Sequence, residues 1–293
     1  MGWRIVVLGK SGSIYCKQNQ LVYDYESESV KIPIEDISVI ILESKEIQLT
    51  SYLLSECANH NVAIFTCDST HTPNAIFTPY FQHSRMTQMA TEQIAWSQPF
   101  KNRLWQRLIK SKIQNQIDVL GENGNDLKFL LDQVESGDKR KTEAVAARMY
   151  WPRVFEKFKR GDGENIINGA LNYAYAIMRG AIARQTAACG FIPCIGVFHS
   201  STLNAFNLVD DLLEPFRPLA DQWVRSVFEN DHQIKEVSPY LKRKLVMVLT
   251  QECKIEGEKV TPLFAIERML ESVRIATLEK DPSRLIVPQI VKR

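Results

Sequence analysis

The sequence lacks any apolar run long enough to span a lipid bilayer. Its N-terminus, MGWRIVVLGKSGS, also lacks the basic stretch followed by a long apolar core that marks a secretory signal peptide. An N-myristoylation site would need Ser or Thr where the chain has Val6. These absences predict a protein with no place in a membrane, and we expect it to be cytoplasmic.

Cysteine pairs of the CxxC kind are missing as well. The six cysteines are Cys16, Cys57, Cys67, Cys189, Cys194 and Cys253. The spacing of Cys189 and Cys194 is wrong for a zinc knuckle, and no second pair accompanies them. Cys57 and Cys67 lie in apolar contexts that are typical of buried free thiols. The cysteines therefore predict neither a structural zinc site nor a disulfide framework.

A phosphate-binding loop for nucleotides is also absent. Gly9-Lys10-Ser11 matches the end of that motif, but the glycine that should precede it by five positions is replaced by Arg4. The tripeptide follows the first predicted strand, and no helical pattern comes after it. We interpret it as a turn, so the sequence gives no sign of ATP-dependent chemistry.

Neither sign of charge dominates, because 36 basic and 34 acidic residues leave a net charge of +2. That balance does not by itself indicate a nucleic-acid-binding protein, although a local patch can hide within it. The hydrophobic fraction of 45% is ordinary for a globular protein. A chain of 293 residues is long enough for one large domain or two ordinary ones.

Short runs of β-branched and aromatic residues fill the first 80 positions and are separated by glycine, asparagine and charged residues. These runs are WRIVVL, SIYC, QLVYDY, SVKIP, ISVIIL and VAIFTCD. They predict strands, and one helix at about residues 49–59 interrupts them. Residues 3–80 therefore form a β-rich unit in this prediction.

Helical spacing takes over from about residue 84. Pro99 breaks or begins a helix, GENGN at 121–125 predicts a loop, and the proline-interrupted C-terminal sequence does not fit a final helix. Residues 164–196 are rich in Ala and Gly, which predicts a helix in the centre of a bundle.

We therefore predict an α+β fold in two domains. Residues 1–83 form a small N-terminal β-rich domain, and residues 84–293 form a larger all-α domain that carries the chemistry.

Potential metal ligands lie on two segments of the helical half. Glu143 falls in one stripe of a predicted helix with Ala147 and Tyr150, at i, i+4 and i+7. The second segment, GVFHSSTLNAFNLVDDLLEPFRP, begins with His199 and continues to a carboxylate cluster at Asp210, Asp211 and Glu214. A solvated acidic face and a core histidine remain the simpler interpretations of each feature alone. Together they predict a divalent cation site, because Mg²⁺ prefers carboxylate oxygen and Mn²⁺ also accepts imidazole nitrogen.

A basic segment surrounds Glu143. Residues 139–160 hold eight basic side chains against Glu143 and Glu156, which gives the segment a charge of +6. The basic residues are Lys139, Arg140, Lys141, Arg148, Arg153, Lys157, Lys159 and Arg160. The segment predicts either a phosphate-binding edge or an ordinary solvated helix face. We name Lys139, Arg140, Lys141, Arg148 and Arg153 as candidate DNA contacts.

Three ordered stretches resemble the large subunit of the CRISPR adaptation integrase, in the form seen in type II systems. They are TEAVAARMYW, NGALNYAYAIMRGAIARQTAACGFIPCIGVFH and NAFNLVDDLLEPFRP. The resemblance covers essentially the whole chain. It implies that Glu143, His199 and Glu214 are the catalytic metal ligands, where many relatives have aspartate in place of Glu214. It gives no role to Asp210 and Asp211.

The resemblance also implies what the protein acts on and what it binds. Such a subunit forms a homodimer through its β-domain, and two dimers clamp the small adaptation subunit. With Mg²⁺ or Mn²⁺, the assembly joins the 3′-hydroxyl ends of a short double-stranded DNA to phosphodiesters at the repeat boundary of a CRISPR array. Two alternatives stay open: a stand-alone metal-dependent nuclease acting on branched DNA, and a scaffold in which His199 and Glu214 are only a buried ion pair.

Overall fold

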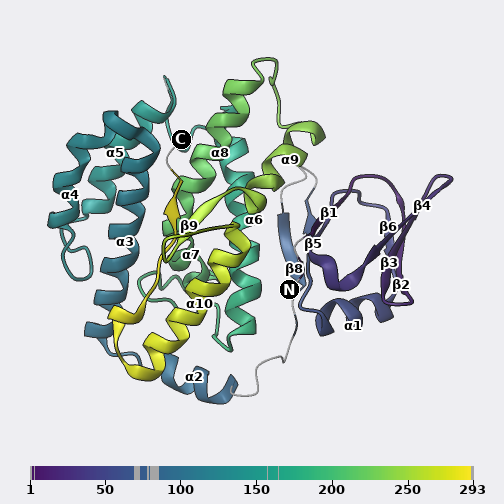
Figure 1. Ribbon diagram of the computed structural model, residues 1–293, viewed down its shortest axis with the longest axis horizontal. Coiled ribbons are helices and arrows are strands. Elements are labelled where there is room, and N and C mark those ends of the chain that lie inside the picture. The colour runs from purple at the N-terminus through teal and green to yellow at the C-terminus, as the bar shows by residue number, and fades with distance from the viewer. Residues whose placement is uncertain are drawn as a thin grey trace. The chain divides into compact units, whose positions relative to one another are not determined.

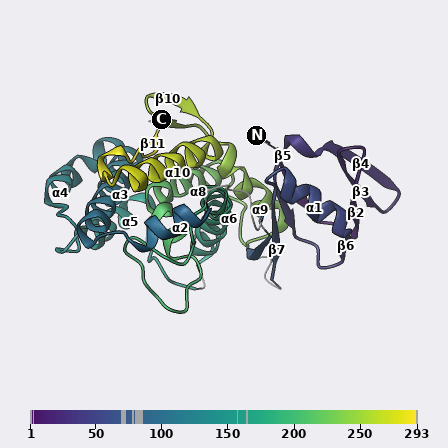
Figure 2. The ribbon, with the colours of Figure 1, turned by 90° about the horizontal axis from the view of Figure 1, so that it is seen from below.

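The computed structural model describes residues 2, 4–68, 73–77, 79, 86–156, 158–163 and 165–291. The chain divides into two compact units, Met1–Ser84 and Arg85–Arg293. The boundary predicted from the sequence, between residues 83 and 84, lies next to this division. Figures 1 and 2 show the elements of each unit from two directions.

Strands dominate the N-terminal unit. In chain order, its elements are β1 (Arg4–Leu8), β2 (Gly12–Lys17), β3 (Gln20–Tyr25), β4 (Glu28–Pro33), the 3₁₀ turn η1 (Ile34–Asp36), β5 (Ile37–Leu42), β6 (Ile47–Leu49), α1 (Ser51–Asn59), β7 (Ala63–Cys67) and β8 (Pro73–Phe77).

These strands form two sheets. One has the order β1-β5-β7-β8, parallel except for the antiparallel β7–β8 pair. The other has the order β4-β3-β2-β6, antiparallel except for the parallel β2–β6 pair. Strand β5, ISVIIL, is buried along its whole length, as strands are in sheets covered on both faces. The core of the unit draws on both sheets and on Leu53 and Cys57 of α1.

Helices dominate the second unit. In chain order, its elements are α2 (Met86–Ile94), α3 (Gln98–Leu120), η2 (Gly121–Leu127), α4 (Lys128–Gln133), α5 (Thr142–Val154), α6 (Ile166–Ala188), α7 (Asn207–Leu213), η3 (Glu214–Phe216), α8 (Arg217–Asn230), α9 (Pro239–Val246), η4 (Met247–Thr250), β9 (Cys253–Ile255), β10 (Glu258–Val260), α10 (Pro262–Glu279), η5 (Pro282–Arg284) and β11 (Gln289–Ile290).

Helix α6 is the centre of this unit, as its small and apolar residues predict. It packs against α7, α8, α9 and α10 (Figure 1). Helix α3 contacts α5, α8 and η3. Pro99 lies in the first turn of α3, a position that suits its ring. Ser97 caps the helix by accepting a hydrogen bond from the backbone N–H of Phe100.

The C-terminal part of the helical unit contains strands that the sequence analysis did not expect. Strands β10, β9 and β11 form a small antiparallel sheet, and β11 contacts α3. The fold class is α+β, and the larger unit is helical with this one addition. Within the described ranges, no helix is both long and apolar enough to cross a membrane.

Candidate active site

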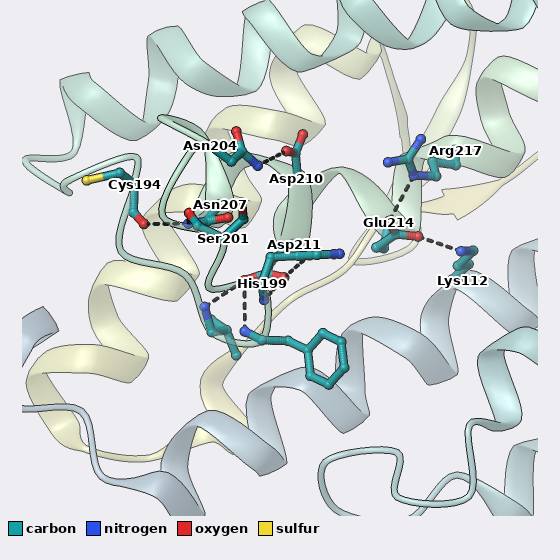
Figure 3. A network of polar contacts seen from close by, with 12 residues as sticks. Lys112, Cys194, His199, Ser201, Asn204, Asn207, Asp210, Asp211, Glu214 and Arg217 are labelled. Carbon is teal, nitrogen blue, oxygen red and sulfur yellow. Dashed lines mark hydrogen bonds and ion pairs between the residues drawn. The ribbon is translucent and has the colours of Figure 1, made fainter.

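Asp211 organises the loop that carries His199. This carboxylate on α7 is fully buried and accepts hydrogen bonds from the backbone N–H groups of Val197, Phe198 and His199, at 2.6, 2.9 and 3.1 Å (Figure 3). The fold is tight here, because a Cβ on Gly196 would lie 2.3 Å from the carbonyl oxygen of His199. Gly196 therefore lets the chain wrap closely around the carboxylate and present the histidine.

The same carboxylate holds the imidazole of His199. Nδ1 of His199 lies 2.6 Å from Oδ1 of Asp211, so Nδ1 carries the proton and Nε2 is the nitrogen available to a cation. This hydrogen bond raises the pKa of His199 above its ordinary value, against the opposing effect of burial. Asp211 thus fixes both the tautomer and the orientation of the ring.

Two of the predicted ligands, Glu143 and Glu214, converge on Lys112. Nζ of Lys112 lies 2.5 Å from Oε1 of Glu143 and 2.5 Å from Oε2 of Glu214. These two carboxylate oxygens are therefore no further apart than twice that distance. Glu143 stands in the first turn of α5, which Asp138 caps through the backbone N–H groups of Thr142 and Glu143.

Charge complementarity holds Glu214 ionised although it is buried. Oε1 of Glu214 lies 2.8 Å from Nε of Arg217, so two cations contact one carboxylate. Burial would raise the pKa of Glu214, but Lys112 and Arg217 outweigh it and lower this pKa to about 2. Burial likewise opposes the charge on Lys112, and the two carboxylates outweigh it, which raises the pKa of this lysine.

The structure thus brings Glu143 and Glu214 together and ties His199 to Asp211. Within the part of the chain that the structure describes, no three His, Cys, Asp or Glu side chains lie close enough together to hold a metal ion. The donors suit Mg²⁺ or Mn²⁺ in kind, since the two carboxylates already meet at one cation. That cation is the Lys112 ammonium, so a divalent ion bound by Glu143 and Glu214 would take its position.

Asp210 belongs to a separate cluster. Its carboxylate pairs with the guanidinium of Arg179 at 2.6 and 2.8 Å and accepts a hydrogen bond from Asn204. Glu214 lies on η3, after α7 has ended, and shares none of these partners. The predicted carboxylate cluster is therefore divided, because Asp210 and Glu214 are held by different partners. The scaffold alternative also loses its central feature, because His199 pairs with Asp211 and Glu214 pairs with Lys112 and Arg217.

The predicted basic segment is only partly available for DNA. Lys139, Arg140, Lys141 and Arg148 are exposed, and Arg140 forms a surface ion pair with Glu135 at 2.9 Å. Arg153 instead lies 2.6 and 2.7 Å from the two carboxylate oxygens of Asp126. Arg160 donates to Asn168 and Asn172 on α6. Lys157 lies outside the described residues.

Sequence reasoning missed Lys112 as a residue of the site and left Asp211 without a role, although the helical pattern contains a signal for both. Lys112 falls on the apolar stripe that Trp105, Leu108 and Ile109 define on α3, where a lysine needs a buried partner. Asp211 similarly falls between Leu208 and Leu212 on the buried face of α7. A charge on a buried stripe therefore marks the groups that hold the predicted ligands.

Two carboxylates, an oriented imidazole and flanking cations suit chemistry on a phosphodiester. The carboxylates provide sites for a cation, and Lys112 and Arg217 supply positive charge where a phosphate adds negative charge. The network contains no serine or cysteine placed beside His199 as a nucleophile, among the contacts of the described residues.

Comparison with known proteins identifies the family of this chain. The family described as CRISPR associated protein Cas1 matches residues 5–254. A CRISPR-associated endonuclease Cas1 from Neisseria meningitidis is 38% identical over 99% of this chain and 97% of its own length. A second such endonuclease, from Saccharolobus solfataricus, is 28% identical over 74% of this chain and 73% of its own.

Solved structures show the same fold at lower sequence identity. A casposase bound to integration product has a TM-score of 0.80 and 17% identity, covering 95% of this chain and 92% of its own. A Cas1 protein from Thermotoga maritima has a TM-score of 0.76 and 18% identity, covering 94% and 97%. A Cas6-RT-Cas1–Cas2 complex has a TM-score of 0.77 and 18% identity over 99% of this chain and 36% of that one. With the family match over most of its length, the chain belongs to the CRISPR-associated Cas1 family of integrases and nucleases.

Proposed function

We propose that this protein is a metal-dependent DNA integrase that inserts new spacers into a CRISPR array by attack of a 3′-hydroxyl on a phosphodiester. The observation that carries the proposal is the convergence of Glu143 and Glu214 on one cation position, each oxygen 2.5 Å from it. Such a site suits transesterification at phosphorus, which needs neither ATP nor a covalent enzyme intermediate.

Each side chain then has a distinct task. Glu143 and Glu214 would hold Mg²⁺ or Mn²⁺, and Nε2 of His199 would complete the site once the three side chains move closer together than they lie here. When bound, the ion would polarise the phosphodiester and stabilise the attacking and leaving oxygens. Asp211 keeps the ring of His199 in the tautomer that leaves Nε2 unprotonated. Arg217 keeps Glu214 ionised, and Lys112 is free to face phosphate once it leaves the carboxylates.

The comparisons support the substrate and partners. The Cas1 relatives named above are called endonucleases, one solved neighbour carries an integration product, and another is an assembly that contains Cas2. We infer that this chain binds double-stranded DNA, forms a homodimer and works with a small adaptation subunit of the Cas2 kind. We expect the reaction to occur in the cytoplasm, where the chromosomal array lies.

Replacement of the proposed ligands tests the function. Glu143→Ala, His199→Ala and Glu214→Ala should each abolish joining of a short duplex to a repeat-bearing plasmid. We expect the rate of joining to fall by at least about 100-fold for each ligand, as it does for other catalytic groups. The matched control is Glu252→Ala, because Glu252 is an exposed carboxylate of the same unit and forms a surface ion pair with Lys259 away from the proposed site. Chelation should stop joining by the wild-type protein, and Mn²⁺ should restore it.

The alternative is a stand-alone nuclease that uses the same residues with water as the nucleophile. Its product distinguishes it: cut DNA without joined DNA, with or without the small partner subunit. Full joining activity in any of the three ligand variants would remove that residue from the proposed site.

A further inference from the structure

An exposed aromatic ring stands directly beside the catalytic histidine. Phe198 is 53% exposed and directly precedes His199 in the loop that Asp211 organises. Its backbone N–H is held by the buried carboxylate of Asp211. The residue is therefore fixed in place while its side chain faces solvent.

A second aromatic residue sets the plane of that ring. Phe198 stacks on Trp105 of α3, with ring centroids 4.3 Å apart and planes inclined by 2°. Both rings meet the imidazole of His199 edge-on, at 5.6 Å from Phe198 and 5.8 Å from Trp105. Trp105 is buried and covers one face of Phe198, so the exposed area belongs to the opposite face and the rim.

We propose that Phe198 is a stacking platform for an unpaired nucleobase next to the reacting phosphodiester. A base has an apolar face that extends the stack of Trp105 and Phe198, and polar edges that stay in the wet surroundings of the site. An aliphatic side chain from a protein partner would bury the polar groups around Phe198 without offering them hydrogen bonds. The platform would hold the terminal nucleotide of a DNA strand so that its phosphate or hydroxyl lies at His199.

This platform would not select sequence. Every base offers a π-face, so stacking tolerates all four and contributes affinity and position alone. A base must leave its pair or lie at a single-stranded end to reach the ring. The inference rests on the proposed function, since it presumes that DNA strands end or react beside His199.

The test uses the full chain, without metal, and a short duplex whose unpaired 3′ nucleotide is 2-aminopurine. Stacking on Phe198 should quench the fluorescence of this base, and the same base within a pair should respond far less. Phe198→Ala and Phe198→Leu should lose the quenching and weaken binding of the overhang duplex about 5- to 100-fold. Phe198→Tyr and Phe198→Trp should keep both.

Phe129→Ala is the matched control. Phe129 is 51% exposed on α4 and lies in no part of the proposed site, so its loss should change neither signal. A purely structural role of Phe198 in packing on Trp105 would be rescued by leucine, and that outcome overturns the proposal.

The outcomes also separate this inference from the proposed function. A wild-type protein that joins DNA but leaves the unpaired base unquenched overturns the platform alone. Quenching that depends on Phe198, in a protein that never joins DNA, supports the platform and contradicts the integrase.

Discussion

At the scale of single residues, helix phase separates groups that lie next to each other in sequence. Asp210 and Asp211 are neighbours, yet one faces Arg179 at the edge of α7 and the other is buried against the His199 loop. Composition and spacing drew attention to Glu143, to His199 and to the acidic cluster that contains Glu214, because carboxylates and a histidine in an apolar context are conspicuous. The choice of Glu214 within that cluster came from the resemblance to the integrase subunit. The partners of these residues depend on how α3, α5 and α7 pack, which one sequence without that packing does not specify.

The ammonium of Lys112 should compete with a metal ion for the carboxylates of Glu143 and Glu214. Lys112→Met leaves Glu143 and Glu214 facing each other without their shared ammonium, so without metal the protein should lose about 3 kcal/mol of unfolding free energy. Mn²⁺ should then stabilise this variant more than it stabilises the wild type, because no ammonium has to be displaced. Thermal unfolding with and without Mn²⁺ measures both effects, independently of activity.

Lys110→Met serves as the comparison for this experiment, since Lys110 lies two residues earlier on the same helix and outside the site. Equal stabilisation of both variants by Mn²⁺ would show that the ion does not bind where Lys112 stands.

Asp211 should set the pH at which activity fails. The hydrogen bond to Asp211 raises the pKa of His199 above 6.5, and a protonated ring cannot bind a cation. Joining by the wild type should therefore decline as the pH falls through this raised pKa. Asp211→Asn removes the charge that raises it, so the decline should move to lower pH while the maximal rate also drops. Rates at saturating Mn²⁺, measured across the range in which imidazole titrates, test this order.

An unshifted acid limb in Asp211→Asn would mean that another group controls the decline. The predictions for the three ligand variants would be unaffected, because they do not depend on which residue sets the pKa of His199.

At the scale of elements, long patterned segments were predictable and short ones were not. The runs that became β1 to β5 and β7 alternate or stay apolar over five or six residues, and α1 matches the helix expected near residues 49–59. Strands β6 and β9 to β11 span two or three residues, too few to show any period. GENGN forms part of the 3₁₀ helix η2, because this segment continues directly from α3 in spite of its glycines.

The basic segment around α5 carries a prediction at this scale. Replacing Lys139, Arg140 and Lys141 together with Gln should weaken binding to all duplexes alike, because phosphate contacts do not read bases. The dependence of log K on log salt should become shallower by about 0.9 for each phosphate contact that is lost. Duplex affinity measured at several salt concentrations gives this slope directly.

Two comparisons make the slope interpretable. Arg153→Gln should change it less, since Asp126 already binds that guanidinium through both oxygens. Lys128→Gln, an exposed lysine on α4, should leave it unchanged. An unaltered slope in the triple variant would make this segment an ordinary solvated surface.

At the scale of the whole molecule, we expect the two units to have separate tasks. The buried core of the N-terminal unit is built from its own two sheets and α1, while every group of the proposed active site belongs to Arg85–Arg293. A unit with its own core can fold alone. The N-terminal unit also has an exposed outer strand, β4, with Val30 39% exposed. Unpaired strand edges are surfaces on which a second chain can associate.

Removal of residues 1–84 should therefore separate association from chemistry. We expect the full chain to scatter light as a dimer of twice 33.6 kDa, and residues 85–293 to remain helical by circular dichroism but monomeric. The truncated protein should lose DNA joining, because in the proposed reaction both ends of the duplex are joined and each protomer of the dimer would supply one active site. When Lys112→Met is introduced into the truncated protein, Mn²⁺ should still raise its thermal stability, since Glu143 and Glu214 both remain. If the truncated protein still dimerised and joined DNA, the dimer contact would belong to the helical unit. If it no longer bound Mn²⁺, the N-terminal unit would be needed to support the metal site.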